Sequence, residues 1–273
     1  MNQPRCYLMC EPAHFRVEYA INPWMDTTAP VDAELAVKQW QRLRETLVDL
    51  GHRVVTVEPQ PDLPDMVYAA NSALVVDGIA YGARFRYPQR AGEAAVYREF
   101  YERHGFRYVE PRHTTEGEGD LAYVGGVILA GFGFRTDPAA HREVQEVFGL
   151  PVISLRLVDP RFYHLDTALA VLDASGRGRI AYYPGAFSPP DRDVLRRLFP
   201  DAVIADEEDA AAFGLNVVSD GRHVVINAEA ERMAARYAAA GYTPVPVELS
   251  ELHKGGGSVK CCVAELRGGP VAA

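Results

Sequence analysis

A cysteine that follows a run of glycines is the feature of this sequence most suggestive of chemistry. Residues 254–262 read Lys-Gly-Gly-Gly-Ser-Val-Lys-Cys-Cys, so Cys261 and Cys262 come shortly after three consecutive glycines. Glycine lets the backbone approach a ligand closely, and a cysteine thiolate is a strong nucleophile. By itself the segment is also typical of a flexible loop that leads into a final strand, so a catalytic interpretation needs a partner.

A histidine far earlier in the chain supplies that partner. Residues 162–167 read Phe-Tyr-His-Leu-Asp-Thr, which places His164 two positions before Asp166. A cysteine and a distant histidine are a candidate pair of nucleophile and acid–base catalyst. We therefore predict covalent catalysis in which Cys261 attacks and His164 carries protons.

The four cysteines lack the spacing of a metal site. Cys261 and Cys262 are adjacent, which is an awkward geometry for two ligands of one tetrahedral ion, and no nearby pair of histidines has zinc spacing. Cys6 and Cys10 are predicted to be buried in a first strand. We expect neither a metal nor a cofactor.

Composition narrows the class of protein. The chain has 273 residues, and 48% of them are hydrophobic, which is enough to form a sizeable core. Charged residues make up 24%, as in a typical globular protein. A net charge of −9 argues against nucleic acid as a partner. No apolar run approaches the roughly 18 residues of a membrane span, and the N-terminus lacks a signal pattern. We expect a cytoplasmic protein with a small-molecule substrate; the sequence gives no indication of oligomeric state.

One structural unit recurs along the chain: two strands joined by a glycine turn, then a helix and a third strand. The turn glycines Gly78, Gly126, Gly176 and Gly221 lie 48, 50 and 45 residues apart. A period of about 50 residues indicates modules arranged around an axis. A further module is split between the termini, with its N-terminal part in residues 6–57 and its closing strand at residues 258–266.

These repeats predict an α/β fold, a five-bladed α/β propeller of ββαβ modules with pseudo-fivefold symmetry, formed as a single domain by residues 1–273. Pairing of the terminal strands removes an open sheet edge. The inner hairpins are expected at residues 71–83, 121–130, 167–183 and 216–226, and the helices at residues 31–50, 91–104, 138–148, 189–199 and 229–240. The main alternative is an ordinary α/β sandwich.

Polar residues gather at the starts of these modules, where blade ends converge on the axis. They are Asp65, Asn71, Glu116 to Asp120, His164, Asp166, Asn216 and Cys261. Any one of them could be a simple turn residue. Their recurrence at the same place in each module favours a binding site at the axis.

With these motifs in place, the chain resembles the guanidino-group-modifying superfamily along essentially its whole length. His164-Leu-Asp166-Thr is similar to the family's His-x-Asp element, and the glycines before Cys261 are similar to its nucleophile loop. Arg135 in Gly-Phe-Arg-Thr and Arg90 before Ala-Gly-Glu resemble its two carboxylate-binding arginines. The resemblance implies the five-bladed fold and a substrate that is arginine or an arginine derivative.

The acidic segment of residues 116–120 is also similar to the family pattern, but it carries one extra residue. Which of Glu116, Glu118 and Asp120 is the functional acidic residue is therefore open. Asp65 and Asp166 are further candidates for holding the substrate.

The residue at position 71 separates branches of the family. Deiminases have an aspartate there, whereas Asn71, together with Asn22 in Tyr-Ala-Ile-Asn-Pro, resembles the arginine dihydrolase branch. That branch converts arginine to ornithine, carbon dioxide and two ammonia molecules. Dimethylarginine dimethylaminohydrolase and arginine deiminase stay open as alternatives, and an amidinotransferase is disfavoured by the short chain.

The implied chemistry suits these side chains. A guanidinium carbon is a poor electrophile, so carboxylates would fix its plane for attack, and the substrate's charge would lower the pKa of Cys261. His164 would protonate the departing amine and then deprotonate water. From another class, a non-catalytic propeller that binds a ribosome or senses a small molecule needs no nucleophile, so Cys261 with His164 argues against it.

Overall fold

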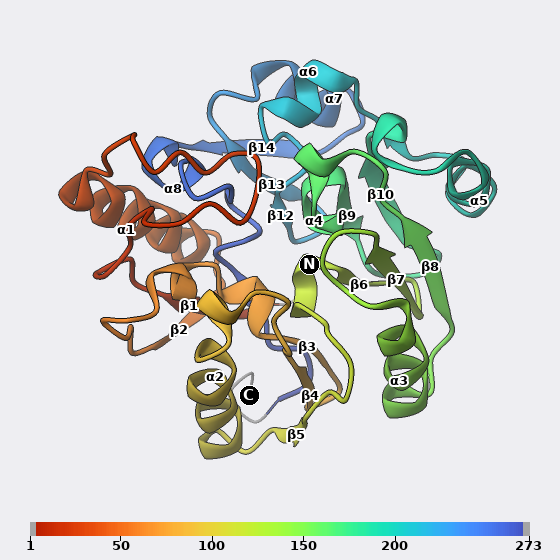
Figure 1. Ribbon diagram of the computed structural model, residues 1–273. Helices are drawn as coiled ribbons and strands as arrows, with labels where there is room; N and C mark the ends of the chain where they lie inside the picture. Colours follow the sequence, from red (N-terminus) through yellow and green to blue (C-terminus); the bar gives the residue numbers. More distant parts are fainter. Residues whose placement is uncertain (1–3, 270–273) are drawn as a thin grey trace.

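The computed structural model describes residues 4–269, and its strands form five sheets around a central axis (Figure 1). Each sheet has three strands, with an antiparallel neighbour on one side of the middle strand and a parallel neighbour on the other. A helix precedes each parallel strand and lies on the outside of the ring (Figure 1). The predicted five-bladed α/β propeller is confirmed.

The elements follow the predicted order. The first blade contains β1 (Cys6–Cys10), α1 (Ala33–Asp49), β2 (Arg53–Val57) and β15 (Ala264–Glu265); the second contains β3 (Ala73–Val76), β4 (Ile79–Gly82), α2 (Glu93–Arg103) and β5 (Arg107–Val109). The third contains β6 (Leu121–Val124), β7 (Val127–Phe132), α3 (Pro138–Phe148) and β8 (Val152–Arg156). The fourth contains β9 (Leu169–Asp173), β10 (Arg179–Tyr182), α5 (Pro189–Leu198) and β11 (Val203–Ile204). The fifth contains β12 (Val218–Ser219), β13 (His223–Asn227), α7 (Glu231–Ala239) and β14 (Thr243–Val247). Short helices are α4 (Leu165–Ala168), α6 (Glu207–Ala211) and α8 (Ser250–His253).

Local sequence explains the turns and helix ends. Asp77 and Gly78 have φ angles of 50° and 75°, as a two-residue hairpin between β3 and β4 requires. The α3 helix begins where the Asp137 side chain accepts from the Ala139 amide, and it ends at Gly149 with φ 65°.

Three inner strands begin two residues later than predicted. The turns before β3, β9 and β12 contain Asn71, Thr167 and Asn216, whose backbone amides donate to the carbonyl three residues earlier, at 3.1, 3.2 and 3.1 Å. These amides are therefore used in local turns and not in a sheet. The repeated turn places a polar residue at the axis in each of these blades.

The predicted final strand of residues 258–266 is wrong over most of its length. Only Ala264–Glu265 forms a strand, which pairs with Leu8 and Tyr7 of β1 and closes the ring as expected. In the preceding segment the amides of Cys262 and Val263 donate to nearby carbonyls, so Cys261 lies in a turn.

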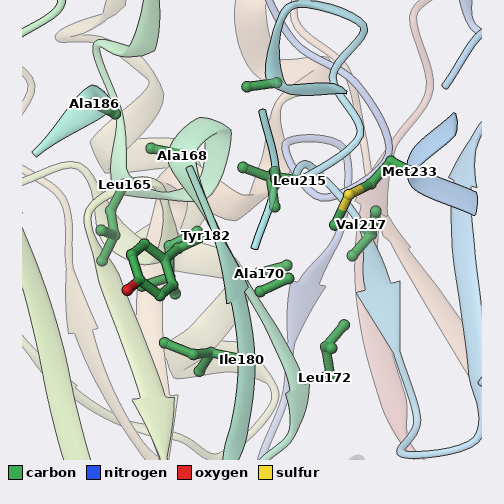
Figure 2. Packing of buried hydrophobic residues seen from close by; sticks show 14 of the residues in the cluster. Leu165, Ala168, Ala170, Leu172, Ile180, Tyr182, Ala186, Leu215, Val217 and Met233 are labelled. Atoms are coloured by element: carbon green, nitrogen blue, oxygen red, sulfur yellow. The ribbon is translucent and has the colours of Figure 1, made fainter. Parts of the chain in front are cut away.

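Hydrophobic clusters fill the spaces between neighbouring sheets. Figure 2 shows part of the cluster between the fourth and fifth blades, where Leu172 and Ile180 pack with residues that include Leu215 and Val217. These side chains are at most 3% exposed, so the blades are fixed relative to the axis. Among the described residues, no helix has the length and apolar character needed to cross a membrane.

Candidate active site

The turns at the axis bring the predicted functional residues together. The 3₁₀ turns η2 (Ala69–Ser72) and η4 (Gly117–Gly119) contact one another, and η4 also contacts α4. Their polar side chains and the cysteine are each at most 5% exposed: Asn71, Glu116, His164, Asp166, Asn216 and Cys261.

The sulfur of Cys261 contacts two polar side chains. Its Sγ donates to Asp166 Oδ2 at 3.3 Å and accepts from Asn216 Nδ2 at 3.1 Å. The glycine run allows this packing, because a Cβ on Gly257 would collide with the Tyr68 ring and lie 3.0 Å from the Cys261 Cβ. The nucleophile loop is thus held tightly against its neighbours.

The surroundings favour a neutral thiol in the free protein. Burial raises the pKa of Cys261 well above its ordinary value, and the negative charge of Asp166 raises that pKa further. A backbone hydrogen bond from Ser258 acts in the opposite direction. A cation bound beside Sγ would lower the pKa, which agrees with the expectation that the substrate's own charge activates the nucleophile.

His164 is paired with Glu116. His164 Nε2 lies 2.7 Å from Glu116 Oε2, and Arg135 Nη1 donates to the same oxygen at 2.9 Å. Burial raises the pKa of Glu116, but the positive charges of Arg135 and His164 outweigh burial and hold this pKa well below its ordinary value. The ionised Glu116 carboxylate therefore fixes the orientation of the imidazole. Among the three candidates of residues 116–120, Glu116 is the one that contacts His164.

Arg135 is fixed at the wall of the site. Its guanidinium lies between the rings of Tyr87 and Tyr163, 4.7 and 4.6 Å from their centroids. Its Nη2 donates to the Ile21 carbonyl at 2.8 Å. Arg135 therefore links the N-terminal loop to Glu116.

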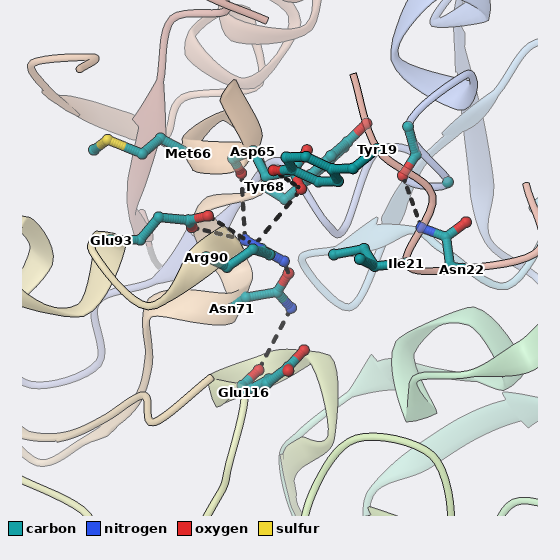
Figure 3. Close-up of polar contacts among 12 residues, drawn as sticks. Tyr19, Ile21, Asn22, Asp65, Met66, Tyr68, Asn71, Arg90, Glu93 and Glu116 are labelled. Carbon is teal, nitrogen blue, oxygen red and sulfur yellow. Dashed lines mark hydrogen bonds and ion pairs between the residues drawn. The ribbon is translucent and has the colours of Figure 1, made fainter. Parts of the chain in front are cut away.

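Arg90 lies at the centre of a second polar cluster (Figure 3). It donates to both carboxylate oxygens of Glu93 at 2.8 Å, and its Nη1 donates to Asn71 Oδ1 at 2.7 Å. Its Nε lies 4.0 Å from Asp65 Oδ2, which also accepts from Tyr19 Oη at 2.9 Å. Arg90 thus orients the Asn71 amide.

Two of the buried carboxylate oxygens that have no hydrogen-bond partner among the described residues belong to this site: Asp65 Oδ1 and Asp166 Oδ1. Burial raises the pKa of both carboxyl groups, that of Asp166 to about 6, with Arg90 opposing the shift at Asp65 and His164 opposing it at Asp166. Unpaired buried acceptors are costly unless a ligand or water satisfies them. They suit a substrate that carries cationic N–H groups.

Two predicted site residues, Glu118 and Asp120, bind other groups of the protein. Glu118 binds Lys260 Nζ at 2.6 Å and also pairs with Arg267, in a cavity of about 50 Å³ along the axis. Asp120 accepts from the amides of Leu165 and Thr136 at 3.1 and 3.2 Å, so it holds the segment next to His164.

Asn22 fastens the N-terminal loop to the glycine run. Its Nδ2 donates to the Gly255 carbonyl at 3.0 Å, and its Oδ1 accepts from the Trp24 amide at 2.9 Å. Its direct contact with substrate stays a prediction.

Sequence reasoning missed two partners that complete the site. Glu93 lies three residues after Arg90, a spacing that brings charged side chains together on a helical turn and was available as a signal. Tyr19 reaches Asp65 from a loop without regular structure, for which the sequence has no pattern. Over residues 4–269, no group of three His, Cys, Asp or Glu side chains could hold a metal ion.

We expect Asp166→Asn to abolish activity while raising the free energy of unfolding at about pH 8 by about 1–3 kcal/mol. The folded-state pKa of about 6 exceeds the ordinary 3.8, so ionisation of this buried group costs stability, and the loss occurs as pH rises from about 4 to about 6. Denaturant unfolding of both proteins at several pH values measures the difference. Equal stability of the two proteins at all pH values would contradict this account of Asp166.

The chain is similar to known enzymes over nearly its whole length. No protein-family model matches the chain. It is 56% identical over 262 residues to an N(G),N(G)-dimethylarginine dimethylaminohydrolase of Mycobacterium tuberculosis, covering 96% of this chain and 86% of that protein. It is 36% identical over 263 residues to a bifunctional arginine dihydrolase/ornithine cyclodeaminase of Nostoc, covering 93% of this chain but only 37% of that longer protein.

A solved structure gives the same relationship. The N-terminal domain of a cyanobacterial arginine dihydrolase, a Cys-to-Ser variant bound to substrate, superposes with a TM-score of 0.91 at 32% identity, covering 96% of this chain and 98% of that one. With relatives at these levels of identity along nearly its whole length, the chain belongs to the guanidino-modifying enzymes of the pentein fold and is a hydrolase of guanidino carbon–nitrogen bonds.

Proposed function

We propose that the protein is an arginine dihydrolase, which converts arginine and two water molecules to ornithine, carbon dioxide and two ammonia molecules in the cytoplasm. The observation that carries the proposal is the amide of Asn71. Its Oδ1 accepts from Arg90 Nη1 at 2.7 Å, and its Nδ2 donates one hydrogen to the Glu116 carbonyl at 3.4 Å, which leaves the second Nδ2 hydrogen for a ligand. A Cβ on Gly119 would collide with this Nδ2 and would lie 3.2 Å from the His164 ring, so the amide donor lies close to the acid–base residue.

In the first cycle, Cys261 attacks the guanidinium carbon and the His164 imidazolium protonates a departing terminal nitrogen, which leaves as ammonia. The carbon is then held as an amidino-thioether. His164 removes a proton from water, water attacks the carbon, and the C–S bond breaks to give citrulline. Asp166, and Asp65 through its free oxygen, would hold the substrate's cationic groups.

In the second cycle, Cys261 attacks the ureido carbon of citrulline before it leaves. A second ammonia departs, water releases the carbon from sulfur as a carbamate, and loss of carbon dioxide from the carbamate gives ornithine. A neutral ureido group needs a donor for its carbonyl oxygen, and the Asn71 Nδ2 supplies one where an aspartate would not.

The alternative is dimethylarginine dimethylaminohydrolase, which yields citrulline and dimethylamine. The relative of that name at 56% identity favours it. The arginine dihydrolases are similar at 36% identity, and the proposal rests on Asn71 and not on the ranking of relatives.

The test compares kcat/KM for arginine, citrulline and asymmetric dimethylarginine, with the products separated by chromatography. The proposal requires ornithine from arginine and a far lower kcat/KM for dimethylarginine. Release of dimethylamine with the higher kcat/KM would establish the alternative.

We expect Arg135→Ala to raise KM about 10- to 100-fold, since a charged hydrogen bond to the substrate carboxylate acts alike in the ground and transition states. Because Arg135 also contacts Glu116, kcat should fall as well, by about tenfold. Steady-state kinetics checks both values, with exposed Arg84→Ala as the matched control. Equal turnover of agmatine, which lacks the carboxylate, would contradict a carboxylate clamp.

A further inference from the structure

Asn216 holds the nucleophile by both its side chain and its backbone. Its Oδ1 accepts from the Cys261 amide at 3.1 Å, while its Nδ2 donates to Cys261 Sγ at 3.1 Å and to the Asp166 carbonyl at 3.0 Å. Its own carbonyl accepts from the Lys260 amide at 3.2 Å. A residue with 0% exposure thus ties the fifth blade to the two segments that carry the nucleophile and its neighbouring carboxylate.

These contacts leave one defined geometry for the amide. Because the backbone N–H of Cys261 requires an acceptor, the oxygen of the Asn216 side chain must face it, and the nitrogen must then face Sγ. The fixed amide therefore offers sulfur an N–H and not a lone pair.

The Asp166 carboxylate is the other polar side chain that contacts Sγ, and it disfavours the thiolate. Asp166 Oδ2 lies 3.3 Å from Sγ and opposes formation of a thiolate. An N–H donor favours the charged form of the group that it contacts, and this contact is made before any substrate binds.

We propose that Asn216 is a catalytic residue, which fixes the Cys261 sulfur and stabilises its thiolate by donating a hydrogen bond. The inference rests on the proposed role of Cys261 as nucleophile. It adds a protein donor to activation by the substrate's charge, and it predicts that the reactivity of the sulfur depends on Asn216 even when no substrate is present.

The test is the rate at which iodoacetamide alkylates Cys261 in the full chain without substrate, located by peptide mass spectrometry. Below the thiol pKa this rate follows the fraction of thiolate. Loss of a hydrogen bond to the charged form raises the pKa of the thiol and so lowers the fraction of thiolate. The higher intrinsic reactivity of a more basic thiolate compensates in part, so Asn216→Ala should lower the rate about 3- to 10-fold.

Two further variants separate this role from a structural one. Asn216→Asp keeps the shape of the side chain and the acceptor for the Cys261 amide, but it places a carboxyl group beside sulfur. It should therefore lower the alkylation rate at least as much as Asn216→Ala does. It also provides the test if Asn216→Ala does not fold. Asn227→Ala removes another buried asparagine of the same blade, whose Nδ2 donates to the Ala212 carbonyl, and it should leave the rate unchanged.

An unchanged rate in folded Asn216→Asp, or an equal decrease in Asn227→Ala, would overturn the proposal. The proposed function has its own test, which fails if the wild-type protein yields no ornithine from arginine. The alkylation rate is measured without turnover, so the two failures can be told apart.

Discussion

Replacing Cys261 by serine should lower kcat by at least about 10³-fold, while Cys262→Ser should retain activity within about threefold of the wild type. Only the sulfur of Cys261 is placed by the structure between the Asp166 carboxylate and the Asn216 amide. Cys262 lies in the same hydrophobic cluster as Cys261, together with Tyr7 and Met9, so cluster membership does not separate the two thiols but the polar contacts of Cys261 do. A serine hydroxyl of far higher pKa cannot replace a thiolate here.

Steady-state turnover of arginine measures this difference, and thermal unfolding confirms that both variants fold. The two adjacent substitutions serve as controls for one another, since each removes one buried thiol. Equal loss of activity in both would show that the nucleophile is assigned wrongly.

Replacing Asn71 by aspartate should stop the reaction at citrulline. Arg90 would retain an acceptor at position 71, because one aspartate oxygen takes the place of Oδ1. The other oxygen would replace Nδ2, which donates to the Glu116 carbonyl at 3.4 Å and lies near Gly119 and His164, so an acceptor would stand where the amide has a donor. It would still bind a cationic guanidinium but would repel the ureido oxygen of citrulline.

Chromatography of the products from arginine measures the ratio of ornithine to citrulline, which should fall by at least about tenfold, as expected for one lost hydrogen bond that leaves a repulsive contact. Citrulline supplied directly to the same variant is the control and should not be consumed. An unchanged ratio would leave Asn71 with only the structural role of ending its turn.

The fold could be predicted because each repeated module contains local sequence signals for its own turns and helix ends. Asp77-Gly78 and the capped helix at Asp137 specify their own backbone geometry, and a recurring turn at the same module position is visible without knowledge of the packing. The repeat placed Asn71, His164 and Cys261 at the module starts, and the motifs around His164 and Cys261 added the second reason to expect them together.

The contacts within the site could not be predicted, because they depend on which way each side chain turns. Glu116, Glu118 and Asp120 occupy one short turn, yet they contact His164, Lys260 and the Leu165 amide respectively. The segment at Cys261 was wrongly predicted as a strand. Its backbone amides donate to local carbonyls and to the Asn216 side-chain oxygen. Such contacts leave no periodic pattern in the sequence, so the turn could not be predicted.

The central claim is that one carbon is attacked twice by Cys261, and the fate of that carbon tests it most directly. Arginine labelled with a heavy carbon isotope at the guanidino position can be followed by NMR during turnover by the wild-type protein. We expect the label to appear in bicarbonate while unlabelled ornithine accumulates in equal amount. Label that remains in citrulline until arginine is exhausted would contradict it.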